Sequence, residues 1–428
     1  MAFRNRRLKS FDECAYLVRD SVLPKEAIGS PYIGLEHIGE GTLSLADHGR
    51  AENVKSVKSR FQRGDILFGK LRPYFRKVIR APFNGVCSTD IWVVRARQGV
   101  DQGFLFYCMS SPEFIEFSTR GSEGTKMPRA KWEFVSKFKI GLPPLPEQRA
   151  IAHILGSLDD KIELNKRMNE TLESMAQAIF KSWFIDFDPV RAKAEGRDPG
   201  LPQPIADLFP DQLVDSKLGE IPAGWRVEPF VETIEVIGGG TPKTSVSEYW
   251  NGDIPWFSVI DAPLESEVWV IDTEKKISRL GVENSSTRIL PVSTTIISAR
   301  GTVGRVALVG VPMAMNQSCY GLRGKMDSEG FFTYFLTKEL VARLRRHAHG
   351  SVFDTITRDT LASISFVVPP VEIITTFEGM IIPIMKCIRD RLFESRTLAE
   401  LRDALLPRLI RGEIRIEDVE RFLADRGL

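Results

Sequence analysis

Two similar junctions decide how this chain is organised. The first reads "GLPPLPEQRAIAHIL" from Gly141 to Leu155, and the second reads "FVVPPVEIITTF" from Phe366 to Phe377. In each, a strand-like run ends at a pair of prolines, and a long charged segment with helical spacing of apolar residues follows. Proline lacks a backbone N–H, so it ends one element and is tolerated at the start of the next helix. The chain therefore reaches the same strand-to-helix transition twice.

The segment after the first junction is predicted to be one long helix. From Glu147 to about Phe184 it has no proline, and its only glycine is Gly156. Asn165 falls on the apolar stripe, where a single polar residue costs stability but can fix the register of a helix pair. A charged helix of about 50 Å is either a spacer or half of a helix pair. The stripe recurs in steps of three and four, as on one helix face: Ile151, Ile154, Leu158, Ile162, Met168, Leu172, Met175 and Ile179.

A second long helix is predicted after the second junction. Pro383 and Pro407 interrupt its pattern, so we expect a late start or kinks there. Its stripe consists of Phe377, Ile381, Ile384, Ile388, Leu392, Leu398, Leu401, Leu405 and Leu409.

Before each junction the sequence is typical of a mixed α and β domain. Gly103–Gly121 and Phe331–Ala348 are predicted helices, and the Pro- and Gly-rich stretch from Asp186 to Trp225 is predicted to be a linker. The β-rich runs are "DILFGKL" (Asp65–Leu71), "DIWVVRA" (Asp90–Ala96), "IPWFSVI" (Ile254–Ile260), "TTIISARG" (Thr294–Gly301) and "RVALVGV" (Arg305–Val311).

The two halves of the chain can be laid on each other. The offset stays near 230 residues and shrinks toward the proline pairs, and the matched positions are Lys70 with Arg300, Ser88 with Ser318, Arg129 with Arg358, and Pro143-Pro144 with Pro369-Pro370. A tandem duplication gives two similar faces related by a pseudo-two-fold, which suits duplex DNA because its backbone also has local two-fold symmetry. A two-lobed scaffold is the alternative interpretation.

Composition sets wider limits. The 428 residues allow two or three domains, and no apolar run is long enough to span a bilayer. The start of the chain shows no secretory signal. Five widely spaced cysteines argue against a disulfide framework or a zinc site and suit the cytoplasm. The net charge of +2 says little, because a basic patch has to be found locally.

Several stretches in order resemble one family, the specificity subunit of type I restriction-modification systems. They are "YIGLEHI" (Tyr32–Ile38), "LPPLPEQRAIAHIL" (Leu142–Leu155), "KSWFIDFDPVRAKAEGR" (Lys181–Arg197), "LGEIPAGW" (Leu218–Trp225), "GGGTPKT" (Gly238–Thr244), "GDIPWFS" (Gly252–Ser258) and "LRDALLPRLIRGEI" (Leu401–Ile414). The resemblance implies an α+β fold with two similar target-recognition domains and two long helices that pack as an antiparallel, coiled-coil-like pair. The implied division is 1–146, first recognition domain; 147–185, central helix; 186–224, linker; 225–370, second recognition domain; 371–428, distal helix and tail.

The resemblance also implies a function. Each domain would read one half of a bipartite, asymmetric site in double-stranded DNA, and the helices would dock two modification subunits. Restriction subunits would join in the full complex. In the family, adenine methylation and ATP-dependent cleavage belong to the partners, so this subunit would be non-catalytic. No cofactor is expected in it, whereas S-adenosylmethionine, ATP and Mg²⁺ are expected on partner subunits.

The residues themselves give no catalytic signature. An adenine methyltransferase would have Asn or Asp before Pro-Pro and an aromatic residue after it, but Leu142 and Val368 precede the two pairs. The Gly-rich "IGGGTP" (Ile237–Pro242) is followed by a polar loop and not by a helix, and no GxxxxGK[ST] occurs. We expect no catalytic residue and no metal site. A fused restriction or methyltransferase chain, the other enzymatic interpretation, would need a domain for which the chain has no room.

Basic and aromatic clusters indicate where DNA would bind. Lys and Arg bind phosphate, Arg can also pair with guanine edges, and Tyr can position phosphate. A solvated strand–turn surface is the alternative for "FGKLRPYFRKVIR" (Phe68–Arg80). The predicted DNA contacts are Lys70, Arg72, Tyr74, Arg76, Lys77, Thr125, Lys126 and Arg129 in the first half, and Thr241, Lys243, Tyr249, Trp250, Ser298, Arg300, Thr302, Arg305 and Arg358 in the second.

The end of the central helix is the predicted partner-binding segment. Trp183 and Phe184 at a helix end favour contact with another surface. Asp186 and Asp188 of "DFDP" are assigned to the same contact, since no lysine is placed as a nuclease site would need. The alternative is that all apolar positions are used within the helix pair.

Overall fold

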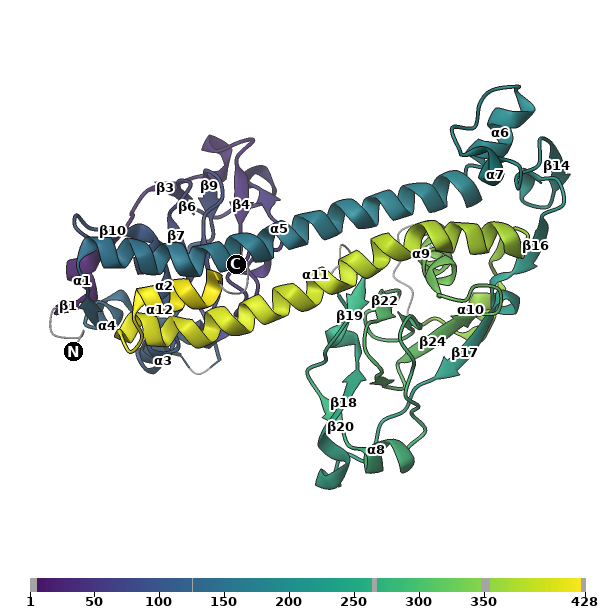
Figure 1. Cartoon of the computed structure of the whole chain (residues 1–428). Coiled ribbons are helices and arrows are strands. Elements are labelled where there is room, and N and C mark those ends of the chain that lie inside the picture. The colour runs from purple at the N-terminus through teal and green to yellow at the C-terminus, as the bar shows by residue number, and fades with distance from the viewer. Residues whose placement is uncertain (1–5, 125, 264–267, 348–354, 425–428) are drawn as a thin grey trace. The chain divides into compact units, whose positions relative to one another are not determined.

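The computed structural model describes residues 6–124, 126–263, 268–347 and 355–424. The chain divides into two compact units, unit 1 (Met1–Leu164 with Ser395–Leu428) and unit 2 (Asn165–Glu394). The long helices α5 (Leu145–Phe184) and α11 (Val371–Arg411) each contribute to both units (Figure 1). Both begin directly after a proline pair, as the two junctions predict.

The globular part of unit 1 is built from short strands and short helices. A four-stranded sheet has the order β2 (Ala15–Leu17), β10 (Ile91–Ala96), β7 (Ile66–Gly69), β8 (Val78–Arg80), and a five-stranded sheet has the order β3 (Ser21–Val22), β6 (Lys58–Phe61), β9 (Gly85–Cys87), β4 (Pro31–Ile33), β5 (Gly49–Arg50). Helices α2 (Gln102–Ser110) and α3 (Pro112–Arg120) share a core with the first sheet. Antiparallel β1 (Arg7–Ser10) and β13 (Lys139–Leu142) close the domain just before α5.

Unit 2 repeats this plan. Its main sheet has the order β17 (Ile234–Gly238), β24 (Cys319–Gly324), β21 (Thr295–Ser298), β22 (Val306–Val309), β19 (Trp269–Val270), and a smaller sheet has the order β20 (Lys276–Ile277), β18 (Trp250–Phe257), β23 (Ala314–Met315). Helix α9 (Phe331–His347) packs on the main sheet. Strands β16 (Arg226–Pro229) and β25 (Ser365–Val368) close the domain just before α11. Figure 1 shows the two domains in purple-blue and green.

The predicted repeat is confirmed by these strand orders, and it extends to fine detail. Tyr32 pairs in parallel with Val86 in unit 1, as Trp256 does with Ala314 in unit 2. The turn after each of these strands is capped by a side chain three residues on: the Gly34 N–H donates to His37 Nδ1 at 2.9 Å, and the Ser258 N–H donates to Asp261 Oδ2 at 2.8 Å.

The residue matches predicted within the repeat are wrong at three positions. The Lys70 N–H donates to the Asp90 carbonyl at 2.9 Å, and the equivalent bond in unit 2 runs from the Ala299 N–H to the Ser318 carbonyl at 2.7 Å. Lys70 therefore corresponds to Ala299 and not to Arg300. Ser318 takes the place of Asp90 and not of Ser88.

Arg129 is the third mismatch. It forms an antiparallel bridge with Leu71, whereas Arg300 forms its bridge with Thr355. Thr355, and not Arg358, therefore holds the place of Arg129. The sequence matches followed similar side chains, but the position of a residue in a sheet is fixed by backbone pairing, and small length differences between the loops shift it.

The two long helices run antiparallel wherever they meet within a unit. In unit 1, Asp159 of α5 pairs with Arg402 of α11, and in unit 2 the Asn169 amide donates to the Ile388 carbonyl. Farther along α5, the ring of Phe180 meets that of Phe377. Rising numbers on α5 thus meet falling numbers on α11, as the fold prediction requires. Asn165 lies in this seam, 1% exposed, and donates to Glu394 at 2.8 Å.

The stripe predicted for α5 is correct in unit 1 and partly wrong in unit 2. Met168 and Met175 are 37% and 51% exposed, whereas Glu173 and Ala176 are buried. This half of α5 packs on α9 as well as on α11, and Glu173 is buried because it pairs with Lys338 of α9 at 2.5 Å. A stripe drawn from apolar residues alone misses a face that includes a paired charge.

Three further expectations need correction. Helix α11 continues through Pro383 and Pro407, so the predicted late start is wrong. The apolar side chains next to Pro383 are packed in the core of unit 2 and those next to Pro407 in the core of unit 1, and this packing offsets the roughly 3 kcal/mol cost of a helical proline. The helix predicted over Gly103–Gly121 is two helices, because Ser111 caps α3 and Pro112 cannot donate to a continuing helix. The stretch predicted to be a linker is folded.

The folded stretch after α5 contains helices α6 (Asp188–Ala194) and α7 (Gln203–Ala206) and a hairpin of β14 (Leu213–Ser216) and β15 (Gly219–Pro222). Phe187, Val190 and Phe209 from this stretch are buried in the core of unit 2. Its prolines and glycines therefore mark turns within a packed segment.

Candidate nucleic-acid interface

Two basic loops of unit 1 are joined by backbone hydrogen bonds. One loop follows β7, and the other connects β11 (Ser122–Glu123) to β12 (Arg129–Ala130). The Ala130 N–H donates to the Lys70 carbonyl at 2.9 Å, and the Arg72 N–H donates to the Pro128 carbonyl at 2.8 Å. These bonds make the loops one surface, which we call the unit-1 platform (residues 70–77, 122–124 and 126–131).

The first loop of this platform is strained. Arg72 and Arg76 flank a short 3-10 turn, and both have left-handed backbones with φ of 50° and 51°. Such a conformation costs a non-glycine residue roughly 1–2 kcal/mol, and strained loops of this kind are common at functional sites. The Arg72 guanidinium donates to the Lys126 carbonyl at 3.1 Å, which ties the two loops together. Tyr74, at the tip of the turn, is 47% exposed.

An ion pair anchors the second loop. The Arg129 guanidinium donates to both carboxylate oxygens of Asp90, from Nε at 2.8 Å and from Nη2 at 3.1 Å. These hydrogen bonds lower the pKa of Asp90 against the opposing effect of burial, so its carboxylate is ionised at neutral pH. Lys131 pairs with Glu123 on the same hairpin at 2.6 Å.

Unit 2 has the same joint. The Ile356 N–H donates to the Ala299 carbonyl at 2.9 Å, which connects the loop after β21 to the segment before α10 (Arg358–Ala362). We call residues 299–305 and 355–358 the unit-2 platform. Arg300, Thr302 and Arg358 are exposed on it, so the structure brings these three predicted contacts together.

The other predicted contacts of unit 2 lie on an adjoining loop. The Thr241 hydroxyl donates to Gln317, which is next to the Ser318 carbonyl of the platform joint. Lys243 is exposed, and its carbonyl accepts from the Trp250 indole at 3.4 Å. Trp250 is half-buried against Trp256, with ring centroids 5.2 Å apart, and Tyr249 precedes it in a 3-10 turn.

Two predicted DNA contacts are used inside the protein. Ser298 is fully buried: its hydroxyl donates to the Thr302 carbonyl at 2.6 Å and accepts from the Arg305 N–H at 2.8 Å, so it shapes the loop and offers no surface to DNA. The Lys77 ammonium donates to the Leu35 carbonyl at 2.8 Å, and its side chain is only 16% exposed. Thr125 lies outside the described residues.

The prediction that Trp183 and Phe184 bind a partner is wrong. Each is 3% exposed in the core of unit 2, where Trp183 packs edge-on against Phe209 at 5.0 Å and Phe184 against Phe377 at 5.1 Å. Their packing partners come partly from the stretch that was predicted to be a linker, so their burial could not be foreseen. Asp186 and Asp188 do reach the surface, although Asp186 is paired with Lys181.

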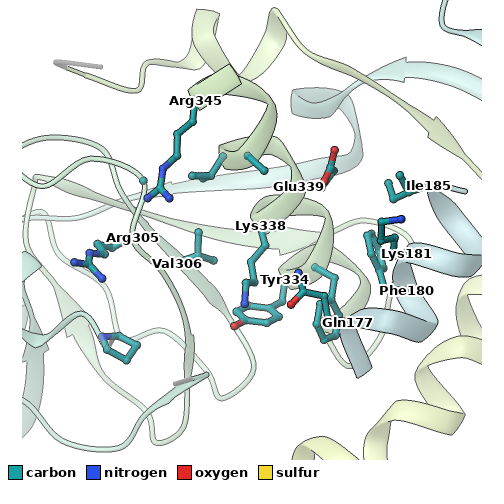
Figure 2. A pocket seen from close by; sticks show the side chains of 15 residues that line it. Gln177, Phe180, Lys181, Ile185, Arg305, Val306, Tyr334, Lys338, Glu339 and Arg345 are labelled. Atoms are coloured by element: carbon teal, nitrogen blue, oxygen red, sulfur yellow. The ribbon is translucent and has the colours of Figure 1, made fainter. Parts of the chain in front are cut away.

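A cleft of about 360 Å³ lies in unit 2 between the end of α5, α9 and the loop before β22 (Figure 2). Lys338 reaches across the Tyr334 ring, 5.6 Å from its centroid, and pairs with Glu173. Glu339 pairs with Arg343 at 2.9 Å. The Lys338–Glu173 pair braces α9 against α5, whereas the Glu339–Arg343 pair lies within α9. These four charges therefore neutralise one another and serve the packing of the helices.

The described part of the chain has neither a metal-binding cluster nor a membrane-spanning helix. Among those residues, no group of three or more His, Cys, Asp or Glu side chains is arranged to hold a metal ion. No helix in the same residues is long and apolar enough to cross a membrane.

Comparison with known families explains the duplicated platform. The sequence model of the type I restriction modification DNA specificity domain matches residues 23–174 and again residues 222–392. The chain belongs to this family. It carries two specificity domains, and each matched segment contains one of the two platforms.

Relatives match along most of this two-domain specificity chain. The HindI specificity subunit of Haemophilus influenzae is 28% identical over 86% of this chain and 91% of its own length. The MjaIX specificity subunit of Methanocaldococcus jannaschii is 26% identical over 93% of this chain and 87% of its own. The crystal structure of the type I restriction-modification S subunit from M. genitalium covers 96% of this chain and 97% of its own, with a TM-score of 0.55 and 15% identity, which supports the fold.

Sequence reasoning missed the acidic member of the first specificity domain's platform. In the sequence Asp90 only marks the start of a predicted strand, and a pattern of basic and aromatic residues does not include an acid. Its partner Arg129 lies 39 positions away in the sequence, so only the fold shows that the two are paired.

Proposed function

We propose that this chain is the DNA-reading subunit of a type I restriction-modification complex, and that each specificity domain reads one half of a bipartite, asymmetric duplex site. One observation carries the proposal: the same joint between two loops occurs in both units, and each copy carries exposed basic side chains. Lys126 and Arg129 do so in unit 1, and Arg300 and Arg358 in unit 2. Cations on loops held by a rigid sheet suit phosphate binding and base reading.

The proposal assigns chemistry to partners. Two modification subunits dock on the long helices, restriction subunits join the full complex, and S-adenosylmethionine, ATP and Mg²⁺ bind to those partners. This subunit contributes no catalytic residue, and the complex acts on DNA in the cytoplasm. The exposed Leu164, Met168 and Met175 of α5 support docking there, because they leave apolar surface on this helix.

The test uses the chain purified together with its modification subunits. A random pool of duplex DNA is selected for binding and sequenced, and the selection is repeated with Lys70→Ala in unit 1 and with Arg300→Ala in unit 2. We expect a split motif, with each substitution relaxing only one half. An equal loss of affinity for all sequences would make both side chains phosphate contacts. Affinity without salt dependence, or no enriched motif, would favour a two-lobed protein scaffold.

A further inference from the structure

Asp90 occupies an unexpected place for an acidic residue. It lies between β9 and β10, its backbone carbonyl accepts from the Lys70 N–H of the unit-1 platform, and its side chain is 27% exposed. DNA phosphates repel a carboxylate, so an acid at a surface that only bound phosphate would weaken binding. The presence of an acid at this surface is therefore best explained by the side chain that it binds.

That side chain is Arg129, whose guanidinium Asp90 binds on one side. Asp90 occupies the Nε and Nη2 side of the Arg129 guanidinium, and the pair is bidentate. The Nη1 group makes only a long contact of 3.5 Å with the Met127 carbonyl. Arg129 is 44% exposed. One hydrogen on Nη2 and at least one on Nη1 therefore remain for an external acceptor. A pair of guanidinium donors is what guanine O6 and N7 accept in the major groove.

The two equivalent positions in unit 2 do not carry an acid–base pair. By backbone pairing, Thr355 stands where Arg129 stands and Ser318 stands where Asp90 stands. Both are neutral, so a carboxylate is not needed to build the joint between the loops. The Asp90–Arg129 pair is an addition to the shared fold.

We propose that Asp90 is a positioning residue that orients Arg129 to read a guanine in the half-site recognised by unit 1. The inference rests on the proposed function. An arginine free to rotate pays an entropic cost when it binds, whereas one held by a carboxylate is already oriented. Arg129 is thus the reader, and Asp90 acts through it.

The experiment is the same DNA selection on the complex with modification subunits, with three variants. Asp90→Asn removes the charge that holds Arg129, and Arg129→Lys keeps the positive charge but loses the planar fork. Glu116→Gln is the matched control, because Glu116 lies on α3 outside the platform and forms an exposed pair with Arg120. Both test variants should lower the preference for guanine at one position of one half-site by roughly 5- to 150-fold, the range expected for one bidentate base contact. Glu116→Gln should leave this preference unchanged.

Each outcome decides between explanations. If Asp90→Asn binds all sequences more tightly with an unchanged motif, Arg129 is a phosphate contact and the inference is wrong. If neither test variant changes the motif, the pair only supports the loop, and the inference is also wrong, while the split wild-type motif still upholds the proposed function. A guanine preference that Asp90→Asn weakens and Glu116→Gln preserves would support the inference. If the wild type selects no motif, the proposed function itself fails.

Discussion

Glu378 of α11 joins the distal helix to α9 in unit 2, and its replacement by glutamine isolates the charge of that joint. The side chain is 2% exposed. Its carboxylate accepts hydrogen bonds from the backbone N–H groups of Ser328, Glu329 and Phe331 at 2.9–3.0 Å, and from the Ser328 hydroxyl at 3.3 Å. Helix α9 begins at Phe331, so the carboxylate satisfies donors that the helix itself cannot, and it lies at the positive end of the helix dipole.

The loss of stability expected for Glu378→Gln can be estimated from these hydrogen bonds. Glutamine has nearly the same shape as glutamate, but only one of its two terminal atoms is an acceptor oxygen. Its NH₂ group would face backbone N–H donors with which it cannot form hydrogen bonds. A buried donor left without a partner costs about 1–3 kcal/mol, and loss of the charge at the helix terminus adds up to ~2 kcal/mol. We expect Glu378→Gln to lower the local stability of this joint by roughly 2–3 kcal/mol, because relaxation of the surrounding structure recovers part of the summed cost.

Hydrogen exchange measured by mass spectrometry on the full chain reports this local stability. A loss of 2–3 kcal/mol corresponds to roughly 30- to 150-fold faster exchange, which should appear in peptides covering the start of α9. Glu400→Gln is the control, because Glu400 forms an exposed pair with Arg396 and should change exchange in α11 little. Unchanged protection at the start of α9 in Glu378→Gln would refute the reasoning.

Two further substitutions test the packing of each unit. Arg402→Met should destabilise unit 1 by about 3–5 kcal/mol in urea unfolding, because it removes the cation that pairs with Asp159 at 2.7 Å and leaves that carboxylate only the Tyr107 hydroxyl at 2.6 Å. Asp159→Asn in the same chain should restore part of the loss, and an additive double variant would contradict the pairing. Burial raises the pKa of Asp327 in unit 2 to about 6, so the folded state binds a proton more tightly than the unfolded state. Relative to Asp327→Asn, the wild type should therefore gain stability as pH falls from about 6 toward 4, by at most ~1.4 kcal/mol per pH unit, and the difference should be flat above pH 7. A difference that is constant across pH 4–7 would show that Asp327 has no raised pKa.

The sequence predicts those features that depend on local chemistry. Pro143-Pro144 and Pro369-Pro370 mark the starts of α5 and α11 because proline acts on its own backbone and its neighbours. The β-rich runs at β7, β10, β21 and β22 are strands for the same local reason. Asn165 is in the helix seam, as the periodicity predicts.

Features that depend on distant partners could not be predicted. Trp183 looked like a contact surface because Phe209, its partner in the core, lies in a stretch with the composition of a linker. Ser298 looked like a loop contact, but its hydroxyl is used twice within the loop. The Asp90–Arg129 pair depends on a strand end and a hairpin that meet only in the folded chain.

The central claim is that the two units read different halves of one DNA site. The most direct measurement is sequencing that detects methylated adenine, applied to the source genome with the gene intact, deleted, and carrying Arg129→Lys. The account predicts that one split, asymmetric methylated motif disappears on deletion, and that Arg129→Lys alters only one half of it. An unchanged methylation pattern after deletion, or a substitution in unit 1 that alters both halves equally, would contradict it.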